Sequence, residues 1–176
     1  MVKDIPSLSA NALEYAAGLI INRMVSAPKA KGVDDVSFLF LDGQDKSDLA
    51  DRLRTLGEEL KRPGMIRDAV NLDLAGCVIL LGAKKMTSGL NCGFCGIPTC
   101  AESIQKDLNC AYPSVDLGIA IGSGLSLAQQ LGLDCRVMYT IGYAAMKMNL
   151  FKDSTIRVSL GIPFSISTKN IFFDRK

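Results

Sequence analysis

The spacing of hydrophobic and polar residues predicts several helices along the chain. Apolar residues recur at helical intervals from 13 to 24, and Asn11 followed three residues later by Glu14 is typical of a capping pair. We therefore expect a helix that begins at Asn11 and ends before Pro28. Further helical patterns occupy residues 47–62, 65–72 and 117–131, and the pattern at 137–150 fits either a helix or a strand followed by a helix.

The helix expected at 117–131 is apolar on nearly every side, which predicts a central position in the fold. Asp116 is expected to cap its first turn, and Gly132 is expected to follow its last. Within it, Gly122-Ser123-Gly124 resembles part of a phosphate-binding loop. Because these glycines fall inside the apolar pattern, close helix packing is favoured over a nucleotide site.

Three short segments predict β-strands. Residues 36–41 and 76–82 are continuous apolar runs, as expected of strands that are buried on both faces. Residues 155–160 alternate between apolar and polar, which is typical of a strand with one covered face, and Gly161-Ile162-Pro163 is expected to end it. The tail at 168–176 is apolar enough to form an edge strand or to dock against a partner subunit.

These elements predict one α/β or α+β domain over residues 1–176. A chain of 176 residues suits a single hydrophobic core, and no internal repeat or Ser/Gly-rich linker divides it. The segment 83–113 is too long for an ordinary connection, so we interpret it as a functional insert.

Composition narrows the possible functions. The formal net charge is only +2, and no basic patch with interleaved aromatic residues indicates nucleic-acid binding. The longest apolar runs are far too short to cross a bilayer, so we expect no membrane span. Histidine is absent, which excludes Ser-His and Cys-His catalysis, His-ligated zinc and a Rieske centre.

Four of the six cysteines lie together in the insert. Cys92, Cys95, Cys100 and Cys110 have the spacing C-x2-C-x4-C-x9-C, which supplies the four sulfur ligands of a [4Fe-4S] cluster. Zinc also binds four cysteines, but its structural sites favour two separate C-x2-C pairs. Disulfides fit poorly because the chain begins without an apolar signal segment, so we expect a reducing, cytoplasmic location. The other two cysteines fall in apolar patterns and are interpreted as core residues.

The cysteine segment resembles a known iron–sulfur domain. Residues 91–100, NCGFCGIPTC, are similar to the loop C-G-x-C-G-x-x-T-C of the [4Fe-4S] domain of the corrinoid iron–sulfur protein, whose fourth cysteine lies further along the chain than Cys110 does here. Segments 26–32, 116–120 and 161–175 together with this loop resemble a bacterial and archaeal family of ferredoxin-domain-containing proteins of unknown function. That resemblance implies iron–sulfur binding and does not supply a reaction.

The order of elements resembles the flavin-dependent nitroreductase fold. This resemblance implies a three-layer domain, a sheet flanked by helices, with the cysteine-rich loop inserted into it. Nitroreductases hold the flavin phosphate with an Arg- and Ser-rich segment before the first helix, whereas residues 1–8 contain one basic residue. Lys29, Lys31 and Lys169 are the candidate phosphate ligands for FMN; the alternative is that they are solvated surface lysines.

Taken together, the sequence predicts a [4Fe-4S] protein that transfers electrons to or from a redox partner of unknown identity. One alternative is a nitroreductase-like oxidoreductase in which the cluster feeds FMN, and another is a zinc-stabilised binding module. A homodimer through the C-terminal tail is also expected. Ile171, Phe172 and Phe173 would otherwise form an exposed apolar patch, and nitroreductases exchange C-terminal segments between subunits.

Overall fold

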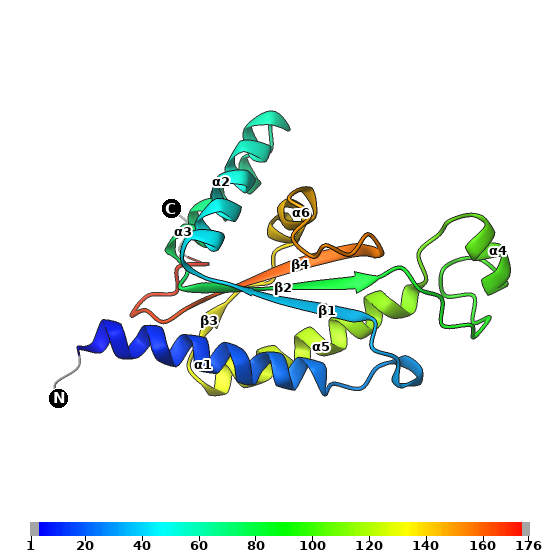
Figure 1. The fold of residues 1–176 in the computed structure, drawn as a ribbon, viewed down its shortest axis with the longest axis horizontal. Helices are drawn as coiled ribbons and strands as arrows, with labels where there is room; N and C mark the ends of the chain where they lie inside the picture. The colour runs from blue at the N-terminus through cyan, green and yellow to red at the C-terminus, as the bar shows by residue number, and fades with distance from the viewer. Residues whose placement is uncertain (1–3, 174–176) are drawn as a thin grey trace.

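The computed structural model describes residues 4–173 as a layered arrangement of helices around one sheet (Figure 1). The elements in chain order are α1 (Ile5–Val25), the 3-10 turn η1 (Ala30–Gly32), β1 (Val36–Leu41), α2 (Gly43–Glu59), α3 (Pro63–Leu74), β2 (Cys77–Lys84), α4 (Cys100–Gln105), α5 (Ala111–Gln130), β3 (Asp134–Cys135), α6 (Tyr139–Lys147) and β4 (Ile156–Ser165).

The sheet has the strand order β1-β2-β4-β3, and every neighbouring pair is antiparallel. Alternate residues of β2 face opposite layers. Ile79 and Leu81 pack with α1 and α5, whereas Val78 and Leu80 pack with α2, α3 and α6. Both faces of β2 are therefore covered, which explains its continuous apolar sequence. The predicted three-layer α/β class is confirmed (Figure 1).

Several element boundaries differ from the prediction. The helix α1 begins at Ile5, so Asn11 and Glu14 are exposed residues within it and not its cap. The helix α5 begins at Ala111 and not after Asp116. Pro113 lies in the first turn of α5, where its missing N–H has no intrahelical partner to lose, so the proline does not prevent an early start.

The strand β4 also runs further than predicted. It continues through Gly161-Ile162-Pro163 and ends at Ser165. On the β3 side, the paired residues of β4 are Phe164 and Ser165, and the bridge from Met138 reaches Gly161. Among the described residues none is paired with Pro163 on that side. The proline therefore costs no ladder hydrogen bond there and does not end the strand.

Two glycines bring helices into close contact with their neighbours. A Cβ at Gly124 of α5 would lie 2.3 Å from Met24 Cε of α1, which confirms close helix packing at this position, whereas one at Gly122 would meet nothing within 4 Å. A Cβ at Gly142 of α6 would lie 2.1 Å from the carbonyl oxygen of Ser159 in β4. The backbone of α6 therefore rests directly on the sheet.

The tail after β4 packs on its own domain within the described residues. Phe172 is only 2% exposed and joins the core beneath α2, α3 and α6. Arg136 donates to the Phe172 carbonyl at 3.0 Å and lies over the Phe173 ring. Residues 171–173 form a turn, so the expected edge strand is wrong for this part of the tail. Residues 174–176 lie outside the described part.

Candidate functional site

The four cysteines of the predicted cluster lie on a segment that projects beyond one end of the sheet (Figure 1). Residues 85–99 of this segment contain no helix or strand, and the short helix α4 follows. Cys92 and Cys95 belong to the loop, Cys100 is the first residue of α4, and Cys110 is the N-cap of α5. The fold thus carries all four thiols on one protruding unit.

A tight turn positions the first pair of cysteines. Gly93 and Gly96 have φ values of +73° and +82°, in the left-handed region that favours glycine. The Gly96 N–H donates to the Gly93 carbonyl at 2.9 Å, which closes a turn around Cys95. Substitution of either glycine would strain the turn between the two cysteines.

Asn91 ties the loop to Cys100. Its backbone N–H donates to Cys100 Sγ at 3.3 Å, and its side-chain Oδ1 accepts from the Cys100 N–H at 2.8 Å. An N–H group directed at sulfur is the kind of contact that stabilises a metal-bound thiolate. Nothing in the sequence spacing pointed to Asn91, because its role depends on a contact nine residues away.

Several hydrogen-bond donors surround the sulfur of Cys110. Its Sγ lies 3.8 Å from Ser88 Oγ. Burial alone would raise the pKa of this thiol, but the backbone N–H groups of Ser88 and Tyr112, together with the Ser88 hydroxyl, bind the sulfur and lower the pKa of Cys110 below its ordinary value. A stabilised thiolate at this position agrees with its predicted role as a ligand.

Aromatic stacking joins the two halves of the segment. Phe94 lies between the first two cysteines, and its ring stacks on Tyr112 with centroids 5.8 Å apart and an interplanar angle of 19°. Phe94 is 69% exposed, which is unusual for a large aromatic side chain. The contact holds the early loop next to the start of α5, close to Cys110.

The sulfur atoms themselves are not gathered in this structure. Within residues 4–173, no group of three or more Cys, His, Asp or Glu side chains is arranged to hold a metal ion. The chemistry of the donor set fits an iron–sulfur cluster, since four thiols share one segment and two of them have N–H donors at sulfur. Residues 85–99 must therefore move if all four are to ligate one cluster.

Of the remaining two cysteines, Cys77 is buried in the core, as predicted, and Cys135 is half-buried against it. Burial raises the pKa of Cys77 to about 12 and that of Cys135 to about 11, with nearby aspartates acting in the same direction. Such thiols are poor metal ligands because the thiolate form is disfavoured. Both also lie on strands of the sheet, away from the projecting segment.

The three lysines predicted to hold a flavin phosphate do not meet within one chain. Lys29 donates to the carbonyls of Met24, Val25 and Ala27 at the end of α1, and Lys31 donates to the Ser88 carbonyl at 3.2 Å. Lys169 belongs to the segment that follows β4, and this segment lies at the end of the sheet opposite α4 (Figure 1). The structure brings together only the first two, on the cysteine side.

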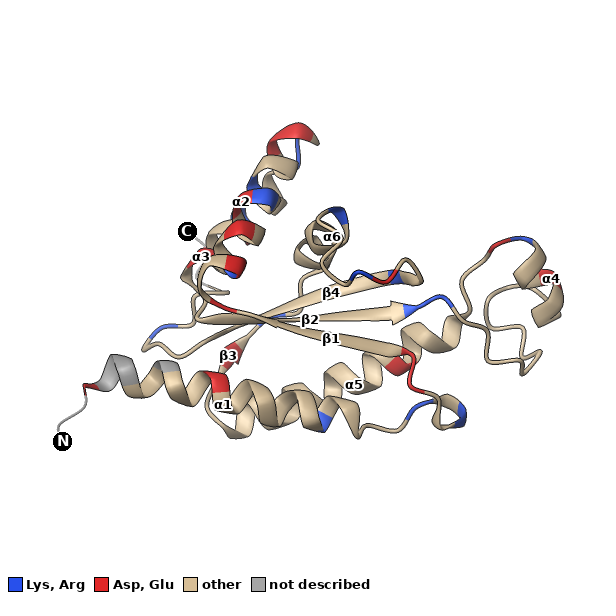
Figure 2. Cartoon of the chain, viewed as in Figure 1, with Lys and Arg blue, Asp and Glu red and all other residues tan. Residues whose placement is uncertain are grey.

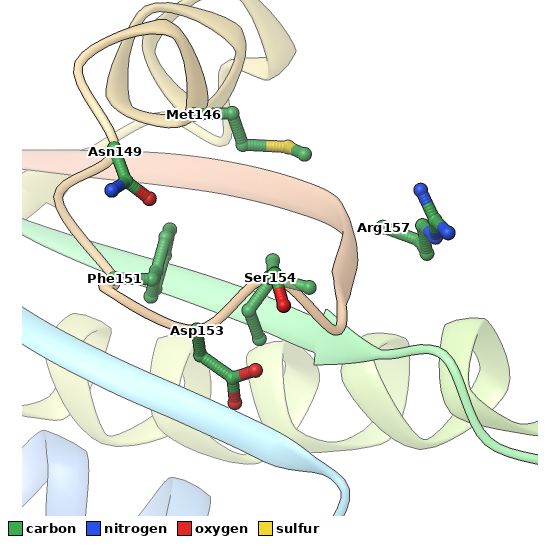
Figure 3. A pocket seen from close by; sticks show the side chains of 7 residues that line it. Met146, Asn149, Phe151, Asp153, Ser154 and Arg157 are labelled. Atoms are coloured by element: carbon green, nitrogen blue, oxygen red, sulfur yellow. The ribbon is translucent and has the colours of Figure 1, made fainter.

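Two adjoining pockets lie near the start of β4. One of about 230 Å³ is lined by Met146, Asn149, Phe151, Asp153, Ser154, Ile156 and Arg157, with Arg157 and Phe151 on opposite sides (Figure 3). A smaller one is lined by Cys110, Lys84, Lys85 and Arg157, among others. Arg157 therefore borders both pockets. The lining of the smaller pocket thus contains three cationic side chains together with Cys110.

Sequence reasoning missed a pair of buried carboxylates next to the cysteine segment. Asp35 precedes β1, and Asp116 lies on α5, where it is the single charged residue of the helix (Figure 2). A lone acidic residue in an otherwise apolar helix was the available signal. The sequence instead predicted Asp116 as a helix cap, because it placed the start of α5 after Asp116 and not at Ala111.

The comparisons with known proteins show the family of the chain. A family described as an uncharacterized protein containing a ferredoxin domain matches residues 106–175, a range that includes Cys110 but not the first three cysteines. An uncharacterized protein of Archaeoglobus fulgidus is 33% identical over 172 residues, which cover 93% of this chain and 91% of the relative. The chain belongs to this family of ferredoxin-domain proteins.

Solved structures similar to this chain are nitroreductase-like. The FMN-dependent nitroreductase NfnB from Mycobacterium smegmatis superimposes with a TM-score of 0.64 and 14% identity, covering 88% of this chain and 78% of that one. Nitroreductase A from Vibrio parahaemolyticus gives 0.60 and 14%, covering 89% and 60%, and NfrA2 from B. megaterium gives 0.59 and 13%, covering 89% and 58%. The chain spans about three fifths of the length of the last two. These likenesses show the nitroreductase-like fold.

No helix in the described part of the chain is long and apolar enough to span a membrane.

Proposed function

We propose that this protein binds a [4Fe-4S] cluster through Cys92, Cys95, Cys100 and Cys110 and serves in electron transfer. The observation that carries the proposal is the placement of four thiols on one projecting segment of a chain that belongs to a ferredoxin-domain family. A cluster in thiolate ligation passes single electrons with little rearrangement. The chain's own residues contribute the ligands, the N–H donors to sulfur and the nearby cations.

The position of the segment also fits exchange of electrons with another protein. Cys92 and Phe94 are exposed, and the segment stands clear of the helices that cover the sheet (Figure 1). A partner could therefore approach the cysteines without opening the core. We further propose a cytoplasmic location, because the six cysteines are all free and cluster ligands must remain reduced.

Metal and sulfide analysis of protein purified without oxygen tests the proposal. We expect roughly four irons and four sulfides per chain and a brown colour that bleaches on reduction. Cys92→Ser, Cys95→Ser and Cys100→Ser should each abolish the cluster. Stoichiometric zinc without iron or sulfide would instead support the zinc-stabilised binding module and overturn the proposal.

A second candidate is an oxidoreductase in which the cluster feeds FMN, and the fold of NfnB, an FMN-dependent nitroreductase, favours it. Lys29 and Lys31 lie on the cysteine side of one chain, so a second subunit would have to bring Lys169 to them. A flavin absorption band in freshly purified protein, lost in the Lys29→Ala/Lys31→Ala double variant, is the expected result for this candidate. Protein that takes up no FMN when FMN is added would exclude it.

A further inference from the structure

A pair of buried carboxylates lies between the helical layer and the cysteine segment. Asp35 is 3% exposed and Asp116 is 2% exposed. Asp35 leads into β1, and Asp116 lies on α5, which begins directly after Cys110. Two carboxylates are expensive to bury as charges, and two close together are more so because like charges repel.

The two carboxylates have different hydrogen-bond environments. Both oxygens of Asp116 accept from the backbone N–H of Ala30, at 3.0 and 3.1 Å. Asp35 Oδ1 is buried and has no hydrogen-bond partner among the described residues. A buried carboxylate oxygen without a donor is poorly stabilised as an anion, whereas a proton on it removes most of that cost.

The charges around Asp35 agree with this assignment. Burial, followed by repulsion from Asp116 and a smaller effect of Asp34, raises the pKa of Asp35. The backbone N–H of Asp35 itself and, more weakly, the attraction of Lys29 oppose this only in part. The Lys29 ammonium already donates to three carbonyls at the end of α1. From β2, the contact with Asp35 is the backbone N–H of Lys84, which donates to the Asp35 carbonyl oxygen at 2.9 Å.

A short series of contacts connects the pair to the cysteine segment. Asp116 accepts a hydrogen bond from the backbone N–H of Ala30, and the next residue, Lys31, donates to the Ser88 carbonyl. The Ser88 hydroxyl in turn lies against Cys110 Sγ. Asp116 is also six residues beyond Cys110 on α5, which is about 9 Å of helix rise. Negative charge added at the cysteines is therefore close enough to act on the pair.

We propose that the Asp35–Asp116 pair is a proton-binding site linked to the redox state of the cysteine segment. If the four cysteines hold the proposed cluster, one electron from a low-potential one-electron reductant would add one negative charge beside the pair, and Asp35 would take up a proton from solvent on its carboxylate. The O–H bond that forms on Asp35 offsets part of the added negative charge. This inference rests on the proposed cluster.

The expected size of the linkage follows from Coulomb's law. One charge acting over about 10 Å at an effective dielectric constant near 20 changes the proton affinity of Asp35 by roughly tenfold. A tenfold change is large enough to make the midpoint potential depend on pH. This dependence lies between the pKa of Asp35 in the oxidised protein and its pKa in the reduced protein. The sign is fixed, because reduction adds negative charge and must favour the protonated form.

Redox titration at a series of pH values tests the inference on cluster-loaded protein whose iron and sulfide content has been measured. Dithionite is the reductant. The midpoint potential of the native protein should fall as pH rises, and that of Asp35→Asn should be independent of pH. Asp34→Asn is the matched control, since it removes an exposed neighbouring carboxylate, and it should behave like the native protein.

Infrared difference spectra of the native protein provide a second readout that needs no variant. Reduction should produce the C=O band of one protonated carboxyl group, and this band should be absent from Asp35→Asn. A potential that does not change with pH, or an unchanged pH dependence in Asp35→Asn, would overturn the inference while leaving the cluster in place. A potential that shifts with sodium or potassium at fixed pH would assign a cation to the pair and also overturn it. Protein without iron and sulfide would overturn both this inference and the proposed function.

Discussion

Replacement of Gly142 by alanine tests whether α6 rests on the sheet as closely as the structure shows. A Cβ at this position would lie 2.1 Å from the Ser159 oxygen, 2.2 Å from its carbonyl carbon and 2.5 Å from the Leu160 nitrogen. These are backbone atoms in the middle of β4, so no side-chain rotation can relieve the contact. The helix would have to move away from the sheet by about 1 Å to reach ordinary van der Waals separation.

Such a movement would loosen the core on one side of the sheet. Ile141, Ala144 and Ala145 of α6 are fully buried against it. Overpacking of this kind costs about 1–3 kcal/mol and occasionally more, while alanine recovers about 1 kcal/mol through its helix propensity. Because the obstruction is backbone, we expect Gly142→Ala to reduce the free energy of unfolding by about 2 kcal/mol or more.

Gly122→Ala is the matched control. It is the same substitution within a helix, but a Cβ at Gly122 would meet nothing within 4 Å. The propensity gain should therefore remain, and the variant should be more stable than the native protein by about 0.5–1 kcal/mol. Urea unfolding followed by circular dichroism measures both values. If the two variants differ by less than about 1 kcal/mol, α6 does not pack on β4 as described.

Four further outcomes are expected. Cys110→Ser should lose the cluster while Cys135→Ser keeps it, and the reverse pattern in iron content would show that the fourth ligand is misassigned. In cluster-free protein, the pKa of Asp35 is raised in the folded state, so its contribution to stability is complete below its unfolded pKa of about 3.9 and is lost as pH rises through the folded pKa. The free energy of unfolding of the native protein should therefore fall relative to that of Asp35→Asn across this pH range. Because residues 85–99 must move to ligate one cluster, limited proteolysis should cut them readily in cluster-free protein and slowly after loading, and equal cutting rates would contradict the proposed ligation. For the predicted tail-mediated homodimer, Phe173→Ser should produce monomers in light scattering, whereas an intact protein that is already monomeric would refute the dimer.

The strands could be predicted well because their signal is local. Each residue of β2 from Cys77 to Ala83 is buried, so the sequence of this strand is apolar without interruption. The errors arose where two local signals compete. Pro163 is typical of the end of a strand. In the structure it lies between Phe164, which pairs with β3, and Gly161, which pairs with Met138, and this placement depends on tertiary pairing. No local pattern contains that information.

The same distinction applies to the candidate site. The four cysteines and their glycines lie within one segment, so the spacing alone was enough to propose a cluster site there. The contacts that tune it come from elsewhere: Ser88 and Lys31 meet only because η1 folds against the start of the segment. Asp35 and Asp116 are far apart in the sequence, and their proximity depends on how α5 crosses the sheet (Figure 1).

The position of α5 explains how the proposed cluster and the proposed proton-binding pair would meet in this fold. The helix begins at Cys110 on the projecting segment and then passes along the sheet, where its apolar face is buried with α1. Asp116 lies at the point where the helix passes from the segment into the core, so its carboxyl group is removed from water within two turns of the Cys110 sulfur. A carboxylate placed further along would be screened from the cysteines by distance, and one placed earlier would be exposed to solvent. Asp116 is therefore near enough to respond to charge on the segment and buried enough for that response to be a change in protonation of its neighbour Asp35.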